Sequence, residues 1–322
     1  MPLHAVCLGA VNVDRRYEVK DLKPFLRVWP ELSPGGEAAL TPEEEIRLQE
    51  LLDRHGRLTG RWGGGQAANV AFALARMGLT AALVGRVGAD EDGKFLRDGL
   101  EGVNLDYLTV QGASGRAYIL VDPSGERTIL VAPNTNDEVG EEDIPWDFLA
   151  QTRYIHLTSF VGDRPLAVQR QVAVRLGDRI PLSLDPGELY ARRGWRALVD
   201  ILDHAEVLLV TEREWQLLGG KMLGHPPFAP PLILIKRGAQ GARMITPMTF
   251  YDFPAEPVSR VVDTLGAGDV FAAGYLAGRV LGLTPPWAAR LANRTAAVSL
   301  MGPGREHYPD RKFLEKQLEW MG

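Results

Sequence analysis

The alternation of short apolar runs with longer amphipathic stretches is the feature of this chain that most constrains its fold. Short apolar runs bounded by turn residues predict buried strands, and the amphipathic stretches between them predict helices. A strand, a crossover helix and a second strand place the two strands parallel in one sheet. The sequence therefore predicts an α/β fold with a mostly parallel sheet. Its strands are expected at His4–Leu8, Thr80–Val84, Tyr154–Leu157, Pro181–Leu184, Val207–Val210 and Leu232–Lys236.

Helices are expected where amphipathic segments stop at a glycine. Asn69–Met77 stops at Gly78, and Asp92–Glu101 stops at Gly102. Glycine is favoured just after a helix because it readily adopts the left-handed conformation that ends one. The last part of the chain predicts three closing helices, at Val270–Leu281, Pro286–Leu300 and Arg311–Trp320.

Two segments depart from this alternation. Residues from about 15 to 62 are polar and interrupted by Pro and Gly, except for a predicted helix with a capping box at Pro42–His55. Residues from about 108 to 132 predict a hairpin, because an Asp-Pro-Ser-Gly turn joins Ala117–Val121 to Thr128–Ala132. We interpret the two segments as a small lid over a pocket. A variable surface insertion is the alternative for the first of them.

Length, charge and cysteine content narrow the class of protein. The chain has 322 residues, of which 45% are hydrophobic, so it can bury a substantial core. Its formal net charge of −5 gives no indication of a surface for nucleic acid or anionic membranes. The single cysteine, Cys7, excludes a disulfide framework. No apolar stretch approaches the roughly 20 residues needed to span a bilayer, and the start of the chain lacks the features of a signal peptide. We therefore expect a cytoplasmic protein that binds neither nucleic acid nor membranes.

The strongest chemical signal is Asp263-Thr264-Leu265-Gly266-Ala267-Gly268-Asp269, which leads directly into a predicted helix. Gly266, Ala267 and Gly268 have little or no side chain, so their backbone N–H groups can approach an anion closely. They stand at the helix N-terminus, where unpaired N–H groups and the helix dipole both favour negative charge. This arrangement would hold a phosphoryl group during its transfer.

Asp269 stands at the same helix end, where it can accept a proton from an attacking hydroxyl group. An ordinary aspartate, with a pKa of about 3.9, is a weak base. A weak base suffices for phosphoryl transfer, because positioning and charge stabilisation dominate a loose transition state. On spacing alone, the same residues also fit a helix cap after a tight turn.

A second glycine-rich segment, Gly63-Gly64-Gly65-Gln66-Ala67-Ala68-Asn69, leads into the helix expected at Asn69–Met77. Three consecutive glycines permit backbone conformations closed to other residues and leave the peptide groups free for hydrogen bonds. The segment fits the dinucleotide-binding pattern only weakly, because Arg57–Trp62 before it is not an apolar strand. The sequence contains no P-loop motif, which excludes P-loop chemistry.

Together these two segments resemble the signatures of the PfkB (ribokinase-like) carbohydrate kinase family, which includes adenosine kinase. The resemblance runs over nearly the whole chain, beginning at Leu8–Asp14, and the Asp263–Asp269 pattern is highly specific. It implies one domain over residues 1–322, folded as a Rossmann-like α/β/α sandwich with a small β-rich lid. It also implies a kinase that uses ATP and Mg²⁺ to phosphorylate a hydroxyl group.

The resemblance also implies roles for individual residues. Asp269 looks like the catalytic base, beside an anion hole formed by Gly266, Ala267 and Gly268. Substrate contacts are expected at Asn12, Asp14, Gly64, Gly65 and Asn69. Carboxylate and amide groups suit this task, because a site built for hydroxyl groups leaves polar groups unpaired when the wrong ligand binds. Taken without the resemblance, Asn12 and Asp14 fit an ordinary turn at a strand end.

Nucleotide and metal contacts follow from the same resemblance. Lys236, Gly238 and Gly241 resemble a loop beside the ATP phosphates and adenine. Asn293 resembles a residue that lines the adenine pocket, and an exposed polar position on a helix is its alternative. The family's Asn-x-x-Glu motif for Mg²⁺ and phosphate appears with Thr211 in place of Asn and with Glu214 retained. A hydroxyl group still bonds a phosphate or a metal-bound water, with less reach.

Some family members bind a monovalent cation, and Asp263 matches a side-chain ligand for K⁺. The carbonyl groups of Leu265 and residues 302–305 would add oxygen ligands. Bracing of the turn is the alternative role for Asp263. Family likeness also makes a homodimer through the lid plausible.

The substrate is a sugar or polyol in our interpretation, mainly because such substrates are widespread in the family. A nucleoside is the alternative within it, for which Trp29, Trp62 and Phe160 would be candidate base-stacking residues. A non-catalytic sugar-binding protein on the same fold is the alternative from another class. Hydrolase chemistry is excluded by the absence of a Gly-x-Ser-x-Gly elbow and of a His-Glu-x-x-His motif.

Overall fold

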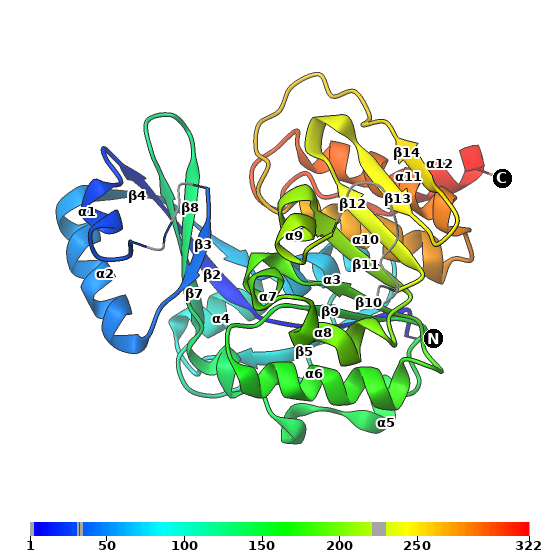
Figure 1. Cartoon of the computed structure of the whole chain (residues 1–322), viewed down its shortest axis with the longest axis horizontal. Coiled ribbons are helices and arrows are strands. Elements are labelled where there is room, and N and C mark those ends of the chain that lie inside the picture. The colour runs from blue at the N-terminus through cyan, green and yellow to red at the C-terminus, as the bar shows by residue number, and fades with distance from the viewer. Residues whose placement is uncertain (1–2, 31, 33–34, 221–229, 322) are drawn as a thin grey trace.

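The computed structural model describes residues 3–30, 32, 35–220 and 230–321. These residues form a nine-stranded sheet in the order β14-β13-β12-β11-β10-β9-β1-β5-β6 (Figure 1). The strands from β12 to β6 are parallel, and β13 and β14 extend one edge antiparallel. The bounds are β1 Ala5–Leu8, β5 Ala81–Val87, β6 Leu108–Val110, β9 Ile155–Thr158, β10 Leu182–Asp185, β11 Val207–Thr211, β12 Leu232–Lys236, β13 Ala242–Ile245 and β14 Phe250–Phe253.

Helices cover both faces of this sheet, and each face has its own apolar core. Because both faces of the parallel strands are buried in this way, these strands appear in the sequence as continuous apolar runs. One face is covered by α3 Gln66–Arg76, α4 Glu91–Asp98, α10 Ala267–Val280, α11 Pro285–Ser299 and α12 Arg311–Met321. The other is covered by α5 Trp146–Leu149, α6 Asp163–Leu176, α7 Gly187–Arg193, α8 Trp195–Leu202 and α9 Glu212–Leu217. Short 3₁₀ turns lie at η1 Asn134–Glu138, η2 Glu141–Asp143 and η3 Gly238–Gln240.

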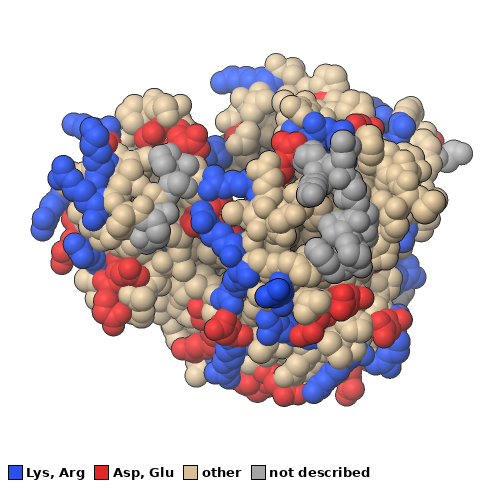
Figure 2. All heavy atoms as spheres, in the orientation of Figure 1, with Lys and Arg blue, Asp and Glu red and all other residues tan. Residues whose placement is uncertain are grey.

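A second, five-stranded sheet stands beside the first and is called the small sheet below (Figure 1). Its order is β3-β8-β7-β2-β4, with bounds β2 Asn12–Val19, β3 Glu37–Ala39, β4 Gly56–Gly64, β7 Gly115–Val121 and β8 Arg127–Ala132. Two helices, α1 Lys23–Leu26 and α2 Pro42–His55, pack on one face of it around Phe25, Trp29 and Leu48. Figure 2 shows that a recess separates the small sheet from the larger part of the molecule.

The expected strands and closing helices are present with shifts of a few residues at their ends. The predicted hairpin is confirmed, because Gly125 N donates to Asp122 O at 2.9 Å and β7 pairs antiparallel with β8. The helix expected at Asp92–Glu101 ends earlier, at Asp98. Within the described residues, no helix combines the length and the apolar character needed to cross a membrane.

The segment from about 15 to 62 holds more regular structure than we expected. Besides the predicted helix α2, it contributes most of β2 and β4, which pair antiparallel with a β-bulge between Arg16 and Tyr17. Asn12 and Asp14 therefore lie on a strand of the small sheet, and the strand-end turn considered for them is wrong.

Candidate active site

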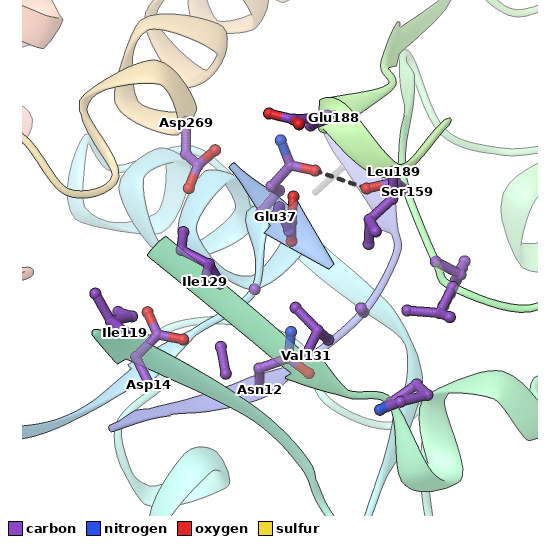
Figure 3. Close-up of a pocket in the computed structure, with 18 of the residues that line it drawn as sticks. Asn12, Asp14, Glu37, Ile119, Ile129, Val131, Ser159, Glu188, Leu189 and Asp269 are labelled. Carbon is purple, nitrogen blue, oxygen red and sulfur yellow. Dashed lines mark hydrogen bonds between the residues drawn. The ribbon is translucent and has the colours of Figure 1, made fainter. Parts of the chain in front are cut away.

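A cavity of about 290 Å³ lies between the small sheet and the carboxyl-terminal edge of the large one. Figure 3 shows Asp269 projecting into it from a helix on one side, while Asp14, Ile119 and Ile129 project from small-sheet strands on the other. Ligands of open α/β sheets bind at this edge, just outside the strand ends. Of the residues that the sequence analysis named as candidates, those that line the cavity are Asn12, Asp14, Gly65, Asn69, Phe160, Glu214, Leu265, Gly266 and Asp269.

Asp269 lies in the first turn of α10 and is buried. Its Oδ2 accepts a hydrogen bond from Asn69 Nδ2 at 2.7 Å. Burial raises the pKa of Asp269 to about 7; the bond from Asn69 opposes this rise, and the nearby Asp185 adds to it. The pKa of Asp269 therefore lies above that of an ordinary aspartate, and its carboxylate is a stronger base near neutral pH.

The start of α10 is a tight turn that lies close to Lys236. Gly266 caps the helix in the left-handed conformation, with φ of 74°, and a β-carbon there would lie 2.6 Å from Tyr308 Oη. The following Ala267 and Gly268 are the first residues of the helix, and Ala267 N donates to Thr264 O at 3.3 Å. A β-carbon at Gly268 would lie 3.5 Å from Lys236 Nζ. The helix N-terminus and the amine of Lys236 therefore place positive charge at the same point.

Lys236, the last residue of β12, forms a buried ion pair with Asp185, whose Oδ2 lies 2.6 Å from Nζ. Burial opposes the charge on Lys236, but Asp185 and Glu214 outweigh it and raise the pKa of Lys236 to about 12. Gln66 Nε2 donates to the other oxygen of Asp185 at 3.3 Å. Asp185 ends β10, which is separated from β12 by β11, so the ends of these two strands hold the amine charged beside α10.

Asn12 and Asp14 begin β2 and point to the same side of the small sheet, as alternate residues of a strand do. Asn12 Oδ1 accepts a hydrogen bond from Asn136 Nδ2 at 2.8 Å. Burial raises the pKa of Asp14 to about 7, although Arg305 opposes the rise. A β-carbon at Gly64 would lie 2.1 Å from Asp14 Oδ1, so glycine there leaves room for this carboxyl group.

The turn from β4 into α3 requires glycine at residue 65. Gly65 has a φ of 91°, and a β-carbon there would lie 2.2 Å from Ala10 O. The turn directs Asn69, on the first turns of α3, toward Asp269. Asn69 Oδ1 accepts from Arg305 Nε at 2.9 Å. Because this bond fixes the oxygen of the amide, it also fixes which end of Asn69 faces Asp269.

Thr211 and Glu214 form a capping box at the start of α9. Glu214 N donates to Thr211 Oγ1 at 3.2 Å, and Thr211 N donates to Glu214 Oε2 at 2.7 Å. Burial raises the pKa of Glu214, while Lys236 opposes the rise. Thr211, where the resemblance led us to expect Asn, is thus a good helix cap. Over the described residues, no three or more His, Cys, Asp or Glu side chains are grouped to hold a metal ion.

Asp263 braces the turn before α10. Its Oδ1 accepts from Leu265 N at 3.0 Å and from Arg127 Nη2 at 3.0 Å, and its Oδ2 accepts from Gly304 N at 3.3 Å. Burial opposes these bonds, which together hold the pKa of Asp263 below its ordinary value. The carboxylate therefore already has several partners where a cation ligand was expected.

The remaining predicted nucleotide contacts lie outside the cavity lining. Asn293 is buried and donates to the carbonyl oxygens of Phe253 at 3.2 Å and Pro254 at 3.1 Å. The exposed position considered for Asn293 is therefore wrong. Gly238 and Gly241 belong to η3 and its cap, between β12 and β13.

Sequence reasoning missed Glu37, which lies on β3 and lines the cavity. Burial raises the pKa of Glu37 to about 7, with Glu188, Glu214 and Asp14 adding to the rise. No hydrogen-bond or ion-pair partner of its carboxyl group occurs in the described parts of the chain. A single glutamate in a polar, glycine-rich segment carries no motif, so no sequence signal marked it.

The three aromatic residues considered for base stacking lie in different parts of the structure. Phe160 lines the cavity, whereas Trp29 is buried in the core of the small sheet and donates to Glu44 Oε1 at 3.2 Å. Trp62 lies on β4 and lines a smaller neighbouring cavity.

Comparison with known proteins gives consistent matches over most of the chain. A family profile described as "pfkB family carbohydrate kinase" matches residues 43–307. An ATP-dependent ribose-1-phosphate kinase of Halopiger xanaduensis is 35% identical over 72% of this chain and 79% of its own length. An uncharacterized sugar kinase of Archaeoglobus fulgidus is 32% identical over 76% of this chain and 99% of its own length.

Solved structures match the same fold. Adenosine kinase from Sinorhizobium meliloti superposes with a TM-score of 0.84 at 20% identity, covering 99% of this chain and all of that one. Ribokinase of Arabidopsis thaliana, complexed with ribose and ATP, superposes with a TM-score of 0.77 at 22% identity, covering 99% of both chains.

Proposed function

This chain belongs to the pfkB family of carbohydrate kinases, and from that premise we propose that it transfers a phosphoryl group from ATP to a hydroxyl group of a sugar or polyol. The observation that carries the proposal is Asp269, a buried carboxylate with a raised pKa of about 7 at the N-terminus of a helix and at the wall of a cavity. Such a group accepts a proton near neutral pH.

A sugar or polyol suits the cavity better than a nucleoside does. Its lining offers hydrogen-bonding groups for several hydroxyls, from Asn12, Asp14, Glu37 and Glu188. Among the described lining residues, Phe160 is the one aromatic side chain, whereas a nucleoside base is held by stacking on aromatic faces.

Each part of the site has a role in this mechanism. Asp14 and Asn12 hold the acceptor by its other hydroxyl groups. Asn69 and burial keep Asp269 oriented and its pKa near neutral, so that Asp269 takes the proton of the reacting hydroxyl. The Gly266–Gly268 backbone and Lys236 stabilise negative charge on the phosphoryl group as it moves to the acceptor oxygen.

The residues at the start of α10 fit the phosphates of ATP, which supplies the phosphoryl group when bound. Lys236 Nζ lies beside Gly268. Gly266, in the left-handed conformation, has no side chain to cover the backbone at the helix end. Glu214 is the candidate for Mg²⁺, because Mg²⁺ is commonly held by one or two carboxylates together with the substrate phosphates. Thr211, Gly238, Gly241 and Asn293 remain proposed contacts on the nucleotide side, and Asp263 remains the proposed K⁺ ligand.

The small sheet is proposed to act as the lid, formed by residues of about 15–62 and 108–132 in one domain of 1–322. Its strands carry Asn12, Asp14, Glu37 and Ile129 over the cavity (Figure 3). Closure would exclude water from the transferring group. A homodimer through this sheet and a location in the cytoplasm belong to the same proposal.

The proposal is tested by measuring ADP release from Mg-ATP across a panel of sugars, polyols and nucleosides, at several K⁺ concentrations. Asp269→Asn should lower kcat by roughly 10²- to 10⁴-fold while substrate binding, measured by calorimetry, is retained. Asp98→Asn, at an exposed position on α4, is the matched control and should leave kcat unchanged. Saturable binding of a sugar without ADP release by the wild type would instead identify a binding protein.

A further inference from the structure

A second cavity, of about 200 Å³, adjoins the first. The two share Ile119 of β7 and Leu265 of the turn before α10 as walls. We call the smaller one the side cavity. Its other lining residues are Arg16, Trp62, Arg127, Val262, Asp263 and Pro303. The side cavity thus lies between the small sheet and the turn that carries the proposed anion hole.

The charge of the walls reverses between the two cavities. Among the described residues, every charged side chain that lines the main cavity is acidic. These side chains are Asp14, Glu37, Glu188, Glu214 and Asp269. The side cavity has two arginines and one aspartate, which gives it a formal charge of +1. A ligand that spans both cavities is therefore expected to be a neutral hydroxyl-bearing molecule at one end and an anion at the other.

Arg127 is held in place on one side of the side cavity. Its Nη2 donates to Asp263 Oδ1 at 3.0 Å and its Nη1 donates to Thr264 Oγ1 at 3.1 Å. Each of these nitrogens carries a second hydrogen, and Nε carries one more. The ion pair thus fixes the guanidinium plane while leaving donors for a ligand.

Arg16 has no such partner. Its Nε is buried and without a hydrogen bond, and no ion pair of its guanidinium occurs in the described residues. It also borders a groove beside the end of β2, where Glu18 of the same strand is already paired with Arg57. An unpaired buried N–H group costs free energy, which a ligand would recover.

We infer that the side cavity binds the phosphate group of a phosphorylated sugar, with Arg16 and Arg127 as its ligands, so that the acceptor of this kinase is a sugar phosphate. The inference rests on the proposed function. Guanidinium groups match the geometry of phosphate oxygens and bind them through paired, charge-assisted hydrogen bonds.

The reaction then converts a sugar monophosphate into a bisphosphate. A bond forms between the free hydroxyl oxygen of the sugar and the γ-phosphorus of ATP. The bond between that phosphorus and the β,γ-bridging oxygen breaks, ADP leaves, and the hydroxyl proton passes to Asp269. The phosphate in the side cavity takes no part in bond exchange and serves only to orient the sugar.

The kinetic test compares free sugars with their phosphate esters: ribose with ribose 1-phosphate and ribose 5-phosphate, and fructose with its 1- and 6-phosphates. Gluconate tests whether a carboxylate serves equally well. For at least one ester, kcat/KM should exceed that of the parent sugar by about 100-fold or more. Arg16→Met should lower kcat/KM for that ester at least tenfold more than for the parent sugar, and Arg16→Lys should recover part of the loss. Arg57→Met, a lid arginine paired with Glu18, is the matched control and should change neither.

Calorimetric binding of the same compounds separates the two hypotheses. Turnover of free sugars with no preference for any ester would overturn the phosphate site and leave the kinase standing. Tight, Arg16-dependent binding of an ester without turnover would overturn the kinase and leave the phosphate site standing. If no ester binds more tightly than its parent sugar, the inference is wrong. A preference for gluconate over the esters would contradict it as well.

Discussion

At the residue scale, Asp14, Glu37 and Asp269 share one condition: each is a carboxyl group that burial brings to a pKa of about 7. Their pKa values in the unfolded chain are near 4, so the folded protein binds more protons than the unfolded chain between about pH 4 and 7. The contribution of these groups to stability therefore falls as the pH rises through that window. Burial of these three carboxyl groups in the cavity therefore lowers the stability of the folded protein at neutral and alkaline pH.

Asp269→Asn should stabilise the protein at alkaline pH and not at acid pH. The amide cannot ionise, so above the folded pKa of about 7 the variant avoids a buried charge. The gain in the free energy of unfolding should be of order 2 kcal/mol at pH 8.5 and close to zero at pH 4. Urea denaturation of wild type, variant and the exposed control Asp98→Asn checks this. A gain that is the same at both pH values would show that ionisation is not its cause.

Asn69→Ala should move the pH dependence of catalysis to higher pH. Asn69 donates to the charged form of Asp269, and this bond lowers the pKa of the carboxyl group. Without it the pKa rises, so the acid limb of the kcat/KM profile should shift upward by about one unit. Asn104→Ala, which removes a surface bond to Asp106 N, is the control. A lower plateau with an unmoved limb would assign Asn69 to substrate binding alone.

At the element scale, a strand can be predicted from the sequence when the residues that stabilise it form a local pattern. Strands of the large sheet are predictable because burial on both faces leaves a continuous apolar run. β2 and β4 were missed because neither is such a run: β2 carries three charged residues in a row, Asp14, Arg15 and Arg16, and β4 is only partly buried and rich in glycine. β2 pairs with β7, about a hundred residues away in the sequence, so its partner is invisible to local analysis.

The same distinction applies to the site. Asp269 and its glycines belong to one continuous motif, which made them recognisable. Glu37, Arg16 and Arg127 belong to no sequence motif. They become candidates for ligand binding only because the fold places them at the walls of cavities. Thr211 is an intermediate case, since its hydroxyl group caps α9 through a local pattern that the sequence does contain.

Substitutions at Thr211 should separate helix capping from ligand binding. Thr211→Val removes the hydroxyl group that accepts from Glu214 N and should cost about 1 kcal/mol in the free energy of unfolding. Thr211→Asn introduces the first residue of the Asn-x-x-Glu motif and, because Asn is also a good cap, should stay within about 0.5 kcal/mol of wild type. Urea denaturation measures both. Equal losses in the two variants would mean that packing, rather than capping, fixes threonine here.

At the scale of the whole molecule, the two sheets are joined where the chain passes from β1 into β2. Asn136, in η1, is buried at this crossing. Its Oδ1 accepts from Val11 N at 3.0 Å, and its Nδ2 donates to Val11 O at 3.1 Å and to Asn12 Oδ1 at 2.8 Å. One side chain thereby sets the backbone at the join and the orientation of a proposed substrate contact.

Asn136→Ala should therefore affect stability and substrate binding together. Buried groups of Val11 and Asn12 lose their partner, which should cost about 2 to 4 kcal/mol in the free energy of unfolding. Asn12 also loses its orientation, so kcat/KM for the best acceptor should fall at least tenfold, mainly through KM. The surface control Asn104→Ala should change neither quantity by much. If the variant were destabilised with an unchanged KM, the join would serve folding alone, and Asn12 would be oriented by the small sheet without help from η1.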